Sequence, residues 1–291
     1  MKQDLPDLKQ SLLLCSQRDD ADLSPDDSSL EGIANLCKKY DLYHLVNNAY
    51  GLQSSKSCHI INMALDIRVD AFVQSTDKNF MVPVGGSIIA SPSASTLEAI
   101  SKTYPGRASS APIIDLFITL LAMGRNGYLA LLKERKVVYE YFKEKLQALA
   151  TTYGEKVVET KFNQISIAMT LDTFKSDPLP SHTESSSEPS TSLNTDSSVA
   201  SSIKSEKSER NQSFIGAMLF NSCTSGIRVV VPMKKEIISG HEFVGFGSHH
   251  NAYPSSYLTV AAAIGMTKED VDLTIKRINK VLKKASKSRI P

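Results

Sequence analysis

Short apolar segments that alternate with helical patterns constrain the fold of this chain more than any other feature. The segments 42–46, 69–74 and 87–90 are rich in aliphatic and aromatic residues and predict strands. Apolar residues at helical spacing over 30–37 and 52–65 predict a helix before each of the first two. Near-continuous apolar strands between helices are typical of a sheet buried on both faces. The chain is therefore predicted to have an α/β fold.

The later part of the chain predicts more helix and a second, smaller domain. Apolar residues recur at helical spacing over 113–121, and again over about 125–151, with Gly124 between the two patterns. We expect both apolar stripes to be core. Strands near 166–171 and 227–231, followed by a helix over about 268–284, would build the smaller domain.

Two segments are predicted to lack packed structure. Residues 1–26 carry many charges and little periodicity. Residues 175–212 contain thirteen serines and almost no bulky apolar residue, so they cannot bury enough surface to offset their ordering entropy. We interpret 175–212 as a disordered insertion, with phosphorylation and a neutral insertion both open.

Composition narrows the class of protein. The net charge of +2 argues against a general polycation that binds nucleic acid without specificity. The four cysteines form no Cys-x-x-Cys pair, and the six histidines form no His-Glu-x-x-His motif, so no metal site is predicted. No apolar run approaches the roughly 20 residues of a membrane span. With a polar N-terminus that does not look like a signal peptide, these features predict a cytoplasmic protein without a membrane partner.

Candidate chemistry gathers where the predicted strands end. Lys78 follows a strand and Asp77, and an apolar stretch ending in Gly85 and Gly86 comes after it. A lysine in a loop beside apolar residues suits Schiff-base chemistry, although most loop lysines are simply exposed. Asn47 and Asn48 end the preceding strand and can reach the same pocket, or else form an asparagine turn.

Arg107 follows the turn Pro105-Gly106 among small hydroxyl residues, an environment that suits a bidentate grip on a phosphate. A surface arginine explains the same pattern. His249 and His250 fall in an irregular loop. From the residues alone, the sequence indicates a soluble α/β protein with a candidate lysine pocket.

Six blocks in order carry a resemblance to a known family. They are VNNAYGLQSSK (46–56), VDAFVQSTDKNFMVPVGGSIIA (69–90), YPGRASSAP (104–112), GYLALLKERK (127–136), SGIRVVVP (225–232) and SHHNAYPSSYLTVAAAIGMTKEDVDLTIKRI (248–278). Together they resemble the O-phosphoseryl-tRNA(Sec) selenium transferases. The resemblance covers about 27–170 and 213–287.

The resemblance implies a partial fold-type I pyridoxal-phosphate transferase. Residues 27–124 would be the C-terminal part of the cofactor-binding domain, at the end of its sheet, and 125–291 the smaller C-terminal domain. The family converts O-phosphoseryl-tRNA(Sec) to selenocysteinyl-tRNA(Sec) with selenophosphate, and acts as a homotetramer.

The resemblance also implies roles for individual residues. Lys78 would carry pyridoxal 5'-phosphate, Asn47 would contact the cofactor ring, and Arg107 would bind the phosphate of the phosphoseryl group. Arg228 would touch the acceptor end of the tRNA, and Lys287 a tRNA phosphate. These roles describe a transferase used in selenoprotein biosynthesis.

Departures from the family leave alternatives open. The match begins inside the cofactor domain, and Leu65-Asp66-Ile67 stands where the family carries a basic residue. The chain is therefore predicted to be truncated, or to be a non-catalytic paralogue that binds tRNA or pairs with the full-length enzyme. A third reading is another fold-type I enzyme, a decarboxylase or cysteine desulfurase relative. Apolar surface left uncovered would make the chain poorly soluble.

Overall fold

A computed structural model describes residues 12–16, 30–103, 109–158, 163–174, 212–232, 235–244 and 254–287. The chain forms two compact units. Unit 1 contains Met1–Phe142, Glu159–Ile167 and Ala261–Lys268, and unit 2 contains Lys143–Val158, Ala168–Val260 and Glu269–Pro291. The predicted domain boundary at 124 falls inside unit 1, so 125–142 belongs with the earlier part of the chain.

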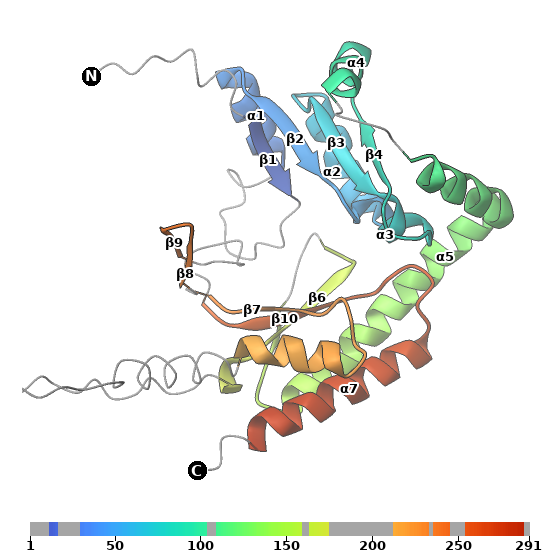
Figure 1. Cartoon of the computed structure of the whole chain (residues 1–291). Coiled ribbons are helices and arrows are strands. Elements are labelled where there is room, and N and C mark those ends of the chain that lie inside the picture. Colours follow the sequence, from blue (N-terminus) through green and yellow to red (C-terminus); the bar gives the residue numbers. More distant parts are fainter. Residues whose placement is uncertain are drawn as a thin grey trace, which may run out of the picture. The chain divides into compact units, whose positions relative to one another are not determined.

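A four-stranded sheet organises unit 1. Its strands are β1 (Leu12–Ser16), β2 (Tyr43–Asn47), β3 (Ala71–Ser75) and β4 (Ser87–Ala90), in that spatial order (Figure 1). β1, β2 and β3 run parallel, and β4 pairs antiparallel with β3. The three predicted strands are confirmed to within two residues. β1 corrects the expectation that 1–26 lacks structure.

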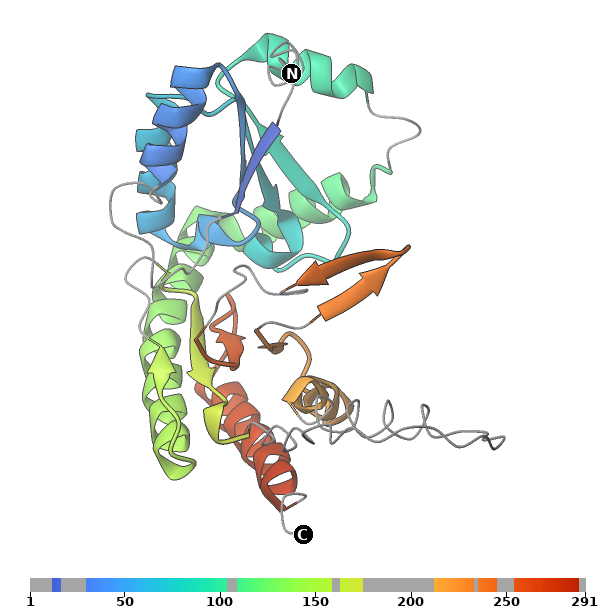
Figure 2. The same ribbon diagram turned by 90° about the vertical axis from the view of Figure 1, so that its left-hand side faces the viewer.

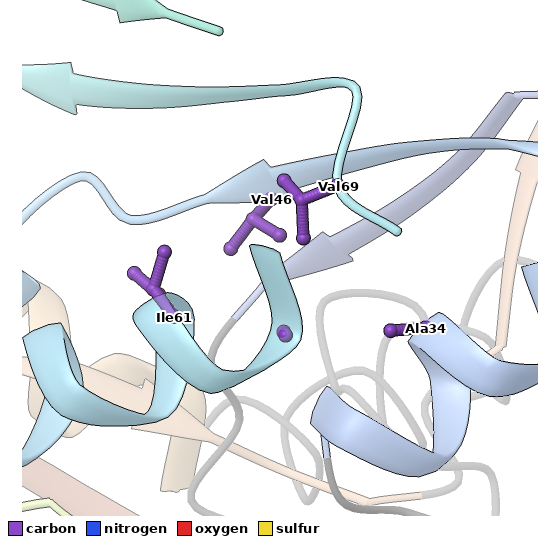
Figure 3. Close-up of a cluster of buried hydrophobic side chains, with 5 residues drawn as sticks. Ala34, Val46, Ile61 and Val69 are labelled. Atoms are coloured by element: carbon purple, nitrogen blue, oxygen red, sulfur yellow. The ribbon is translucent and has the colours of Figure 1, made fainter. Parts of the chain in front are cut away.

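Two helices cover one face of this sheet. α1 (Leu30–Tyr40) and α2 (Ser55–Leu65), with the short η2 (Gly51–Gln53) before α2, lie on the same side (Figures 1 and 2). Figure 3 shows the core between them and the strands, made by Ala34, Val46, Ile61, Ala64 and Val69. The Ser54 hydroxyl begins α2 by accepting a hydrogen bond from the Ser57 amide at 3.3 Å. β4 exposes alternate residues, Ile89 among them, so the expectation of a sheet buried on both faces is wrong there.

The prediction of a core stripe over 113–121 is wrong. These residues begin α5 (Ala111–Thr152), after α4 (Ala94–Thr103), and Ile113, Phe117 and Leu121 are 70%, 62% and 68% exposed. The helical periodicity is present, but no described element packs over it. Phe142 and Leu146, on the second half of α5, are buried as predicted.

Gly124 interrupts α5. Its backbone, at φ 62° and ψ 173°, is not helical, and Figure 1 shows the helix changing direction between its two halves. A glycine adopts such a conformation without the steric cost of a Cβ. Among the described residues, α5 is the one helix long and apolar enough, by length and composition only, to cross a membrane. The helix of a soluble protein can meet the same criterion.

Unit 2 centres on a second sheet. It consists of β5 (Val157–Val158), β6 (Ser166–Thr170), β10 (Tyr257–Ala261) and β7 (Arg228–Val230), in the order β5-β6-β10-β7. β8 (Lys235–Ile238) and β9 (His241–Val244) pair as a separate hairpin. α7 (Lys268–Lys287) runs beside the last turns of α5 (Figures 1 and 2), and the Tyr153 hydroxyl donates to Asn279 Oδ1 at 2.6 Å. The predicted strands and final helix are confirmed.

Unit 2 also shows where the serine-rich segment ends. Residues 175–211 lie outside the described residues, as do His249 and His250. Gln212, the last residue of the predicted insertion, is buried and begins a helix over 212–221. Its amide donates to the Leu171 carbonyl at 3.0 Å and accepts from the Ser256 hydroxyl at 2.9 Å. Packed structure therefore resumes one residue earlier than predicted.

Candidate active site

Lys78 lies in a short helix rather than in the predicted loop. α3 (Thr76–Phe80) begins directly after β3, with extended Ser75 before it and Asp77 in its first turn. It ends at Met81, whose backbone is left-handed at φ 56°. The Lys78 side chain is 48% exposed, and its Nζ donates to Ser75 Oγ at 3.0 Å and lies 3.6 Å from Asp77 Oδ2. The amine is therefore accessible while its backbone belongs to an ordered turn.

Buried polar side chains hold α3 from the inside. Gln53 Nε2 donates to the Lys78 carbonyl oxygen at 2.5 Å. Asn79 Nδ2 donates to the carbonyl oxygens of Ala49, at 2.9 Å, and Ser75, at 2.7 Å. Because Gln53 and Ala49 follow β2, these bonds tie the turn after β2 to the helix after β3.

Asn47 lies at the same edge of the sheet as Lys78. It is the last residue of β2, it is exposed, and it pairs in register with Val73 of β3. The parallel strands bring both carboxyl ends together, as the α/β pattern predicted. Asn48, the next residue, is 1% exposed, and its side-chain amide has no hydrogen-bond partner among the described residues. A buried unpaired amide is costly and calls for a functional or solvent partner.

Close contacts lie at both ends of the α3 segment. The Thr76 amide donates to the Gly86 carbonyl oxygen at 3.0 Å, and a Cβ at Gly86 would meet the Thr76 hydroxyl and Pro112. At the other end, a Cβ at Gly265 would lie 2.6 Å from Met81 Cε. The absence of a side chain at Gly86 therefore allows the chain to pack closely on itself.

The remaining predicted site residues are placed elsewhere. Arg107 lies outside the described residues, which omit 104–108. Arg228 is the exposed first residue of β7, opposite Thr259 of β10, in unit 2. Lys287 is the last residue of α7, also in unit 2. Of the five predicted residues, the described structure brings Lys78 and Asn47 to one edge.

Sequence reasoning missed Arg135, which lies in a KERK run that looked like a solvated charged face. Arg135 is 1% exposed and donates to the carbonyl oxygens of Gln164, at 2.7 Å, and Gln53, at 3.4 Å. Burial lowers the pKa of its guanidinium, partly countered by Tyr139. The spacing could have indicated this burial. Arg135 stands three and seven residues before buried Val138 and Phe142, which places it on the same face of the helix.

α7 separates an apolar face from a basic one. Val271, Ile278 and Leu282 are buried, whereas the exposed lysines lie at helical spacing on the other side: Lys276, Lys280, Lys283 and Lys284. Such a stripe of cations is typical of a surface that meets phosphates. Among the described residues, no group of three His, Cys, Asp or Glu side chains is placed to hold a metal ion.

Comparison with known proteins gives one consistent result. The family model for O-phosphoseryl-tRNA(Sec) selenium transferase matches residues 14–184 and 181–283. The O-phosphoseryl-tRNA(Sec) selenium transferase of Dictyostelium discoideum is 45% identical over 256 residues, which are 87% of this chain and 50% of that protein. The chain thus spans about half the length of the curated relatives that it matches.

Solved structures agree on the fold. A crystal structure of an archaeal O-phosphoseryl-tRNA(Sec) selenium transferase superposes with a TM-score of 0.64 at 26% identity, over 87% of this chain and 47% of that one. The Oryza sativa TDC with PLP superposes with a TM-score of 0.52 at 11% identity, over 88% of this chain and 45% of that one, and shows the fold alone. The chain therefore has part of the fold-type I architecture, as the family resemblance implied.

Proposed function

The chain belongs to the O-phosphoseryl-tRNA(Sec) selenium transferase family, and we propose that it takes part in converting O-phosphoseryl-tRNA(Sec) to selenocysteinyl-tRNA(Sec) with selenophosphate. The observation that carries the proposal is the accessible amine of Lys78 on a helix held rigidly at a sheet edge. A reactive lysine needs both properties, because the amine must meet its partner in one orientation.

The residues present fit pyridoxal 5'-phosphate, the proposed cofactor. An accessible lysine amine lies at the edge where Asn47 is exposed and where the buried Asn48 amide lacks a partner among the described residues. When bound, this cofactor stores the electrons of a carbanion. We assign Lys78 to hold the cofactor and to take the α-proton of phosphoserine, and Asn47 to contact the ring.

Arg107 is proposed to bind the phosphate that leaves phosphoserine. A guanidinium offers two parallel N–H donors to a phosphate and neutralises the charge that builds on it. Losing a contact of this kind commonly lowers the rate by about a hundredfold or more. In a complete enzyme, Arg107→Ala should therefore lower turnover by about that factor, and unchanged turnover would remove the assignment.

The tRNA is proposed to contact unit 2. Arg228 would meet its acceptor end, and Lys287 a phosphate. The exposed lysine stripe of α7 supports this, because it continues toward Lys287 on the same helix. Phosphate contacts weaken with salt as counterions are released. Replacing Lys280 and Lys284 with Gln should lower the salt dependence of tRNA binding, with Lys102→Gln in unit 1 as the control.

A second copy of the chain is the proposed cover for the first half of α5, within a homotetramer. Ile113, Phe117 and Leu121 expose a contiguous apolar surface of a kind that monomers rarely leave bare. Obligate interfaces between copies are apolar in the same way. Phe117→Lys with Leu121→Lys should lower the mass measured by light scattering, whereas Val137→Lys on the second half of α5 should not.

We also propose a cytoplasmic location. Cys37, Cys58 and Cys223 are free thiols in the described part of the chain, as expected in a reducing compartment. Cell fractionation with a tagged chain tests the location, and recovery in a membrane pellet after a high-salt wash would contradict it.

Capture of the cofactor tests the catalytic proposal. We would add pyridoxal 5'-phosphate to the 291-residue chain, reduce with borohydride, and locate the added mass by peptide mapping. The expected result is one modified lysine, Lys78, and loss of the visible absorbance band in Lys78→Ala. Lys136→Ala, which removes an exposed lysine of α5, should leave both readouts unchanged.

A non-catalytic partner protein is the alternative, and the exposed lysines of α7 would suit its binding to tRNA equally well. In that case the chain would bind tRNA, or the full-length enzyme, without capturing the cofactor. Absence of modification at Lys78 together with salt-sensitive tRNA binding would decide for this alternative.

A further inference from the structure

A buried arginine is connected through one glutamine to the backbone of Lys78. We propose that Arg135 and Gln53 are positioning residues, which fix the Lys78 backbone and so aim its amine. The inference concerns how the lysine is held, and it rests on the proposed function for the use of that amine.

The connection runs through two hydrogen bonds within unit 1, and a third bond anchors Arg135. Arg135 donates to the Gln164 carbonyl oxygen at 2.7 Å and to the Gln53 carbonyl oxygen at 3.4 Å. The Gln53 side chain then donates to the Lys78 carbonyl oxygen at 2.5 Å. Gln53 ends η2, and its side chain is also buried. α5 is thereby connected to α3 through two buried side chains, Arg135 of α5 and the intermediate Gln53.

α3 needs such outside support. It has five residues, far fewer than the roughly 12 to 15 at which an isolated helix becomes stable in water. Its shape must come from tertiary contacts, and the Gln53 amide is the described side chain that bonds the Lys78 backbone itself. We therefore expect loss of that bond to raise the backbone mobility of Lys78 more than that of any other part of unit 1.

The burial of Arg135 points to a specific role. A buried guanidinium is costly unless its donors are used, and its Nε has no partner among the described residues. An apolar side chain would fill the same space more cheaply. What an apolar side chain cannot supply is a donor to the carbonyl oxygens of Gln53 and Gln164 at the same time.

Amide hydrogen exchange on the whole 291-residue chain tests the proposal without any cofactor. In Gln53→Met, which keeps length and removes the donor, exchange over 76–81 should quicken about tenfold. Exchange over 30–47 should stay as in the wild type. Gln147→Met, the same replacement at an exposed glutamine of α5, should change neither segment. Arg135→Lys, which keeps a donor, should fall between the wild type and Arg135→Met.

A second readout follows the lysine itself. At a fixed concentration of pyridoxal 5'-phosphate, the rate of borohydride-trapped modification at Lys78 should fall about fivefold to tenfold in Gln53→Met. Failure of wild-type Lys78 to be modified would count against the proposed function and leave the exchange result standing.

Unchanged exchange over 76–81 in Gln53→Met would overturn the positioning role. A second combination of results would also overturn it. In that combination, Gln53→Met would speed exchange equally in every protected segment, and Gln53→Asn, which shortens the side chain by one methylene, would leave exchange over 76–81 as in the wild type.

Discussion

Asn79 donates a hydrogen bond from its fully buried side-chain amide to the carbonyl oxygen of Ala49, at a distance of 2.9 Å. Thirty residues of sequence separate the two, and the bond brings the turn after β2 against the helix after β3. The same amide also bonds the Ser75 carbonyl oxygen at 2.7 Å. Asn79 thus joins the two segments that carry Asn47 and Lys78.

Asn79→Ala should lower the free energy of unfolding by about 2 kcal/mol, because the carbonyl oxygens of half-buried Ala49 and Ser75 lose a buried donor. Urea denaturation measures the change. The control is Asn35→Ala, which removes a surface amide bonded to Glu31 within α1 and should cost well under 1 kcal/mol. Equal effects of the two changes would show that the Asn79 bonds do not stabilise the site.

Gly86→Ala should destabilise the protein by about 2 kcal/mol, in the usual range for overpacking. The added Cβ would meet the Thr76 hydroxyl and would lie 2.9 Å from Pro112 Cβ. Gly216→Ala is the matched control, since its Cβ would meet Val229 at an ordinary 3.5 Å in the helix over 212–221. The control should be neutral or slightly stabilising because alanine favours helix. Urea denaturation measures both variants. Equal unfolding midpoints for Gly86→Ala and Gly216→Ala would contradict the expected clash at Gly86.

Glu155→Gln should destabilise unit 2 by about 3 kcal/mol, because a buried carboxylate accepts several hydrogen bonds there. Its oxygens accept from the Thr170 hydroxyl, from the Asp172 amide at 3.0 Å and from the Thr173 amide at 2.7 Å. The variant places an NH2 group against donors. Thermal melting measures the change. Glu144→Gln, at an exposed position of α5, should leave the melting temperature unchanged. An unchanged melting temperature in Glu155→Gln would show that the hydrogen bonds of the Glu155 carboxylate do not stabilise unit 2.

Stability should fall as the pH rises above about 9, in part through two thiols. Burial raises the pKa of the Cys58 thiol, against the smaller effect of a backbone hydrogen bond, and burial is also the main cause of the raised pKa of Cys37. A thiol with a raised pKa in the folded state holds its proton more tightly than in the unfolded chain. Each thiol's contribution to the free energy of unfolding is therefore complete below the ordinary pKa of 9.0. It is lost as the pH rises through the pKa of the thiol in the folded state.

Urea denaturation near pH 8 and near pH 10.5 measures this effect. The difference between the two conditions should be smaller in a variant with Cys37→Ala and Cys58→Ala than in the wild type. Exposed Cys223 should react with iodoacetamide faster than buried Cys37 or half-buried Cys58. An unchanged pH dependence in the double variant would exclude these thiols as its source.

The sequence predicted elements whose own periodicity is strong. The apolar face of α7 and the apolar strand β3 needed no knowledge of their neighbours. α3 was missed because five residues carry no period, and β1 because three leucines in a charged segment form a strand only beside β2. At 113–121 the period correctly indicated a helix, but periodicity does not tell what covers an apolar face.

The candidate site also combines features that the sequence predicts with features that depend on tertiary packing. A lysine a few residues after a strand was visible in the sequence, and so was the asparagine that ends the neighbouring strand. The contacts that hold the lysine were not. Gln53 and Arg135 are 82 residues apart, and their hydrogen bond follows from tertiary packing rather than from any local pattern.

The fit of Gly265 against Met81 places a segment made much later, Ala261–Lys268, in the same unit as Lys78. On a ribosome that adds 5 to 20 residues each second, the roughly 190 residues between Lys78 and Gly265 take roughly 10 to 40 s to make. During that interval the lysine segment has been synthesised, but the glycine that packs against Met81 does not yet exist. The surroundings of Lys78 are thus completed only after the sheet β1-β2-β3-β4 beside them has been synthesised.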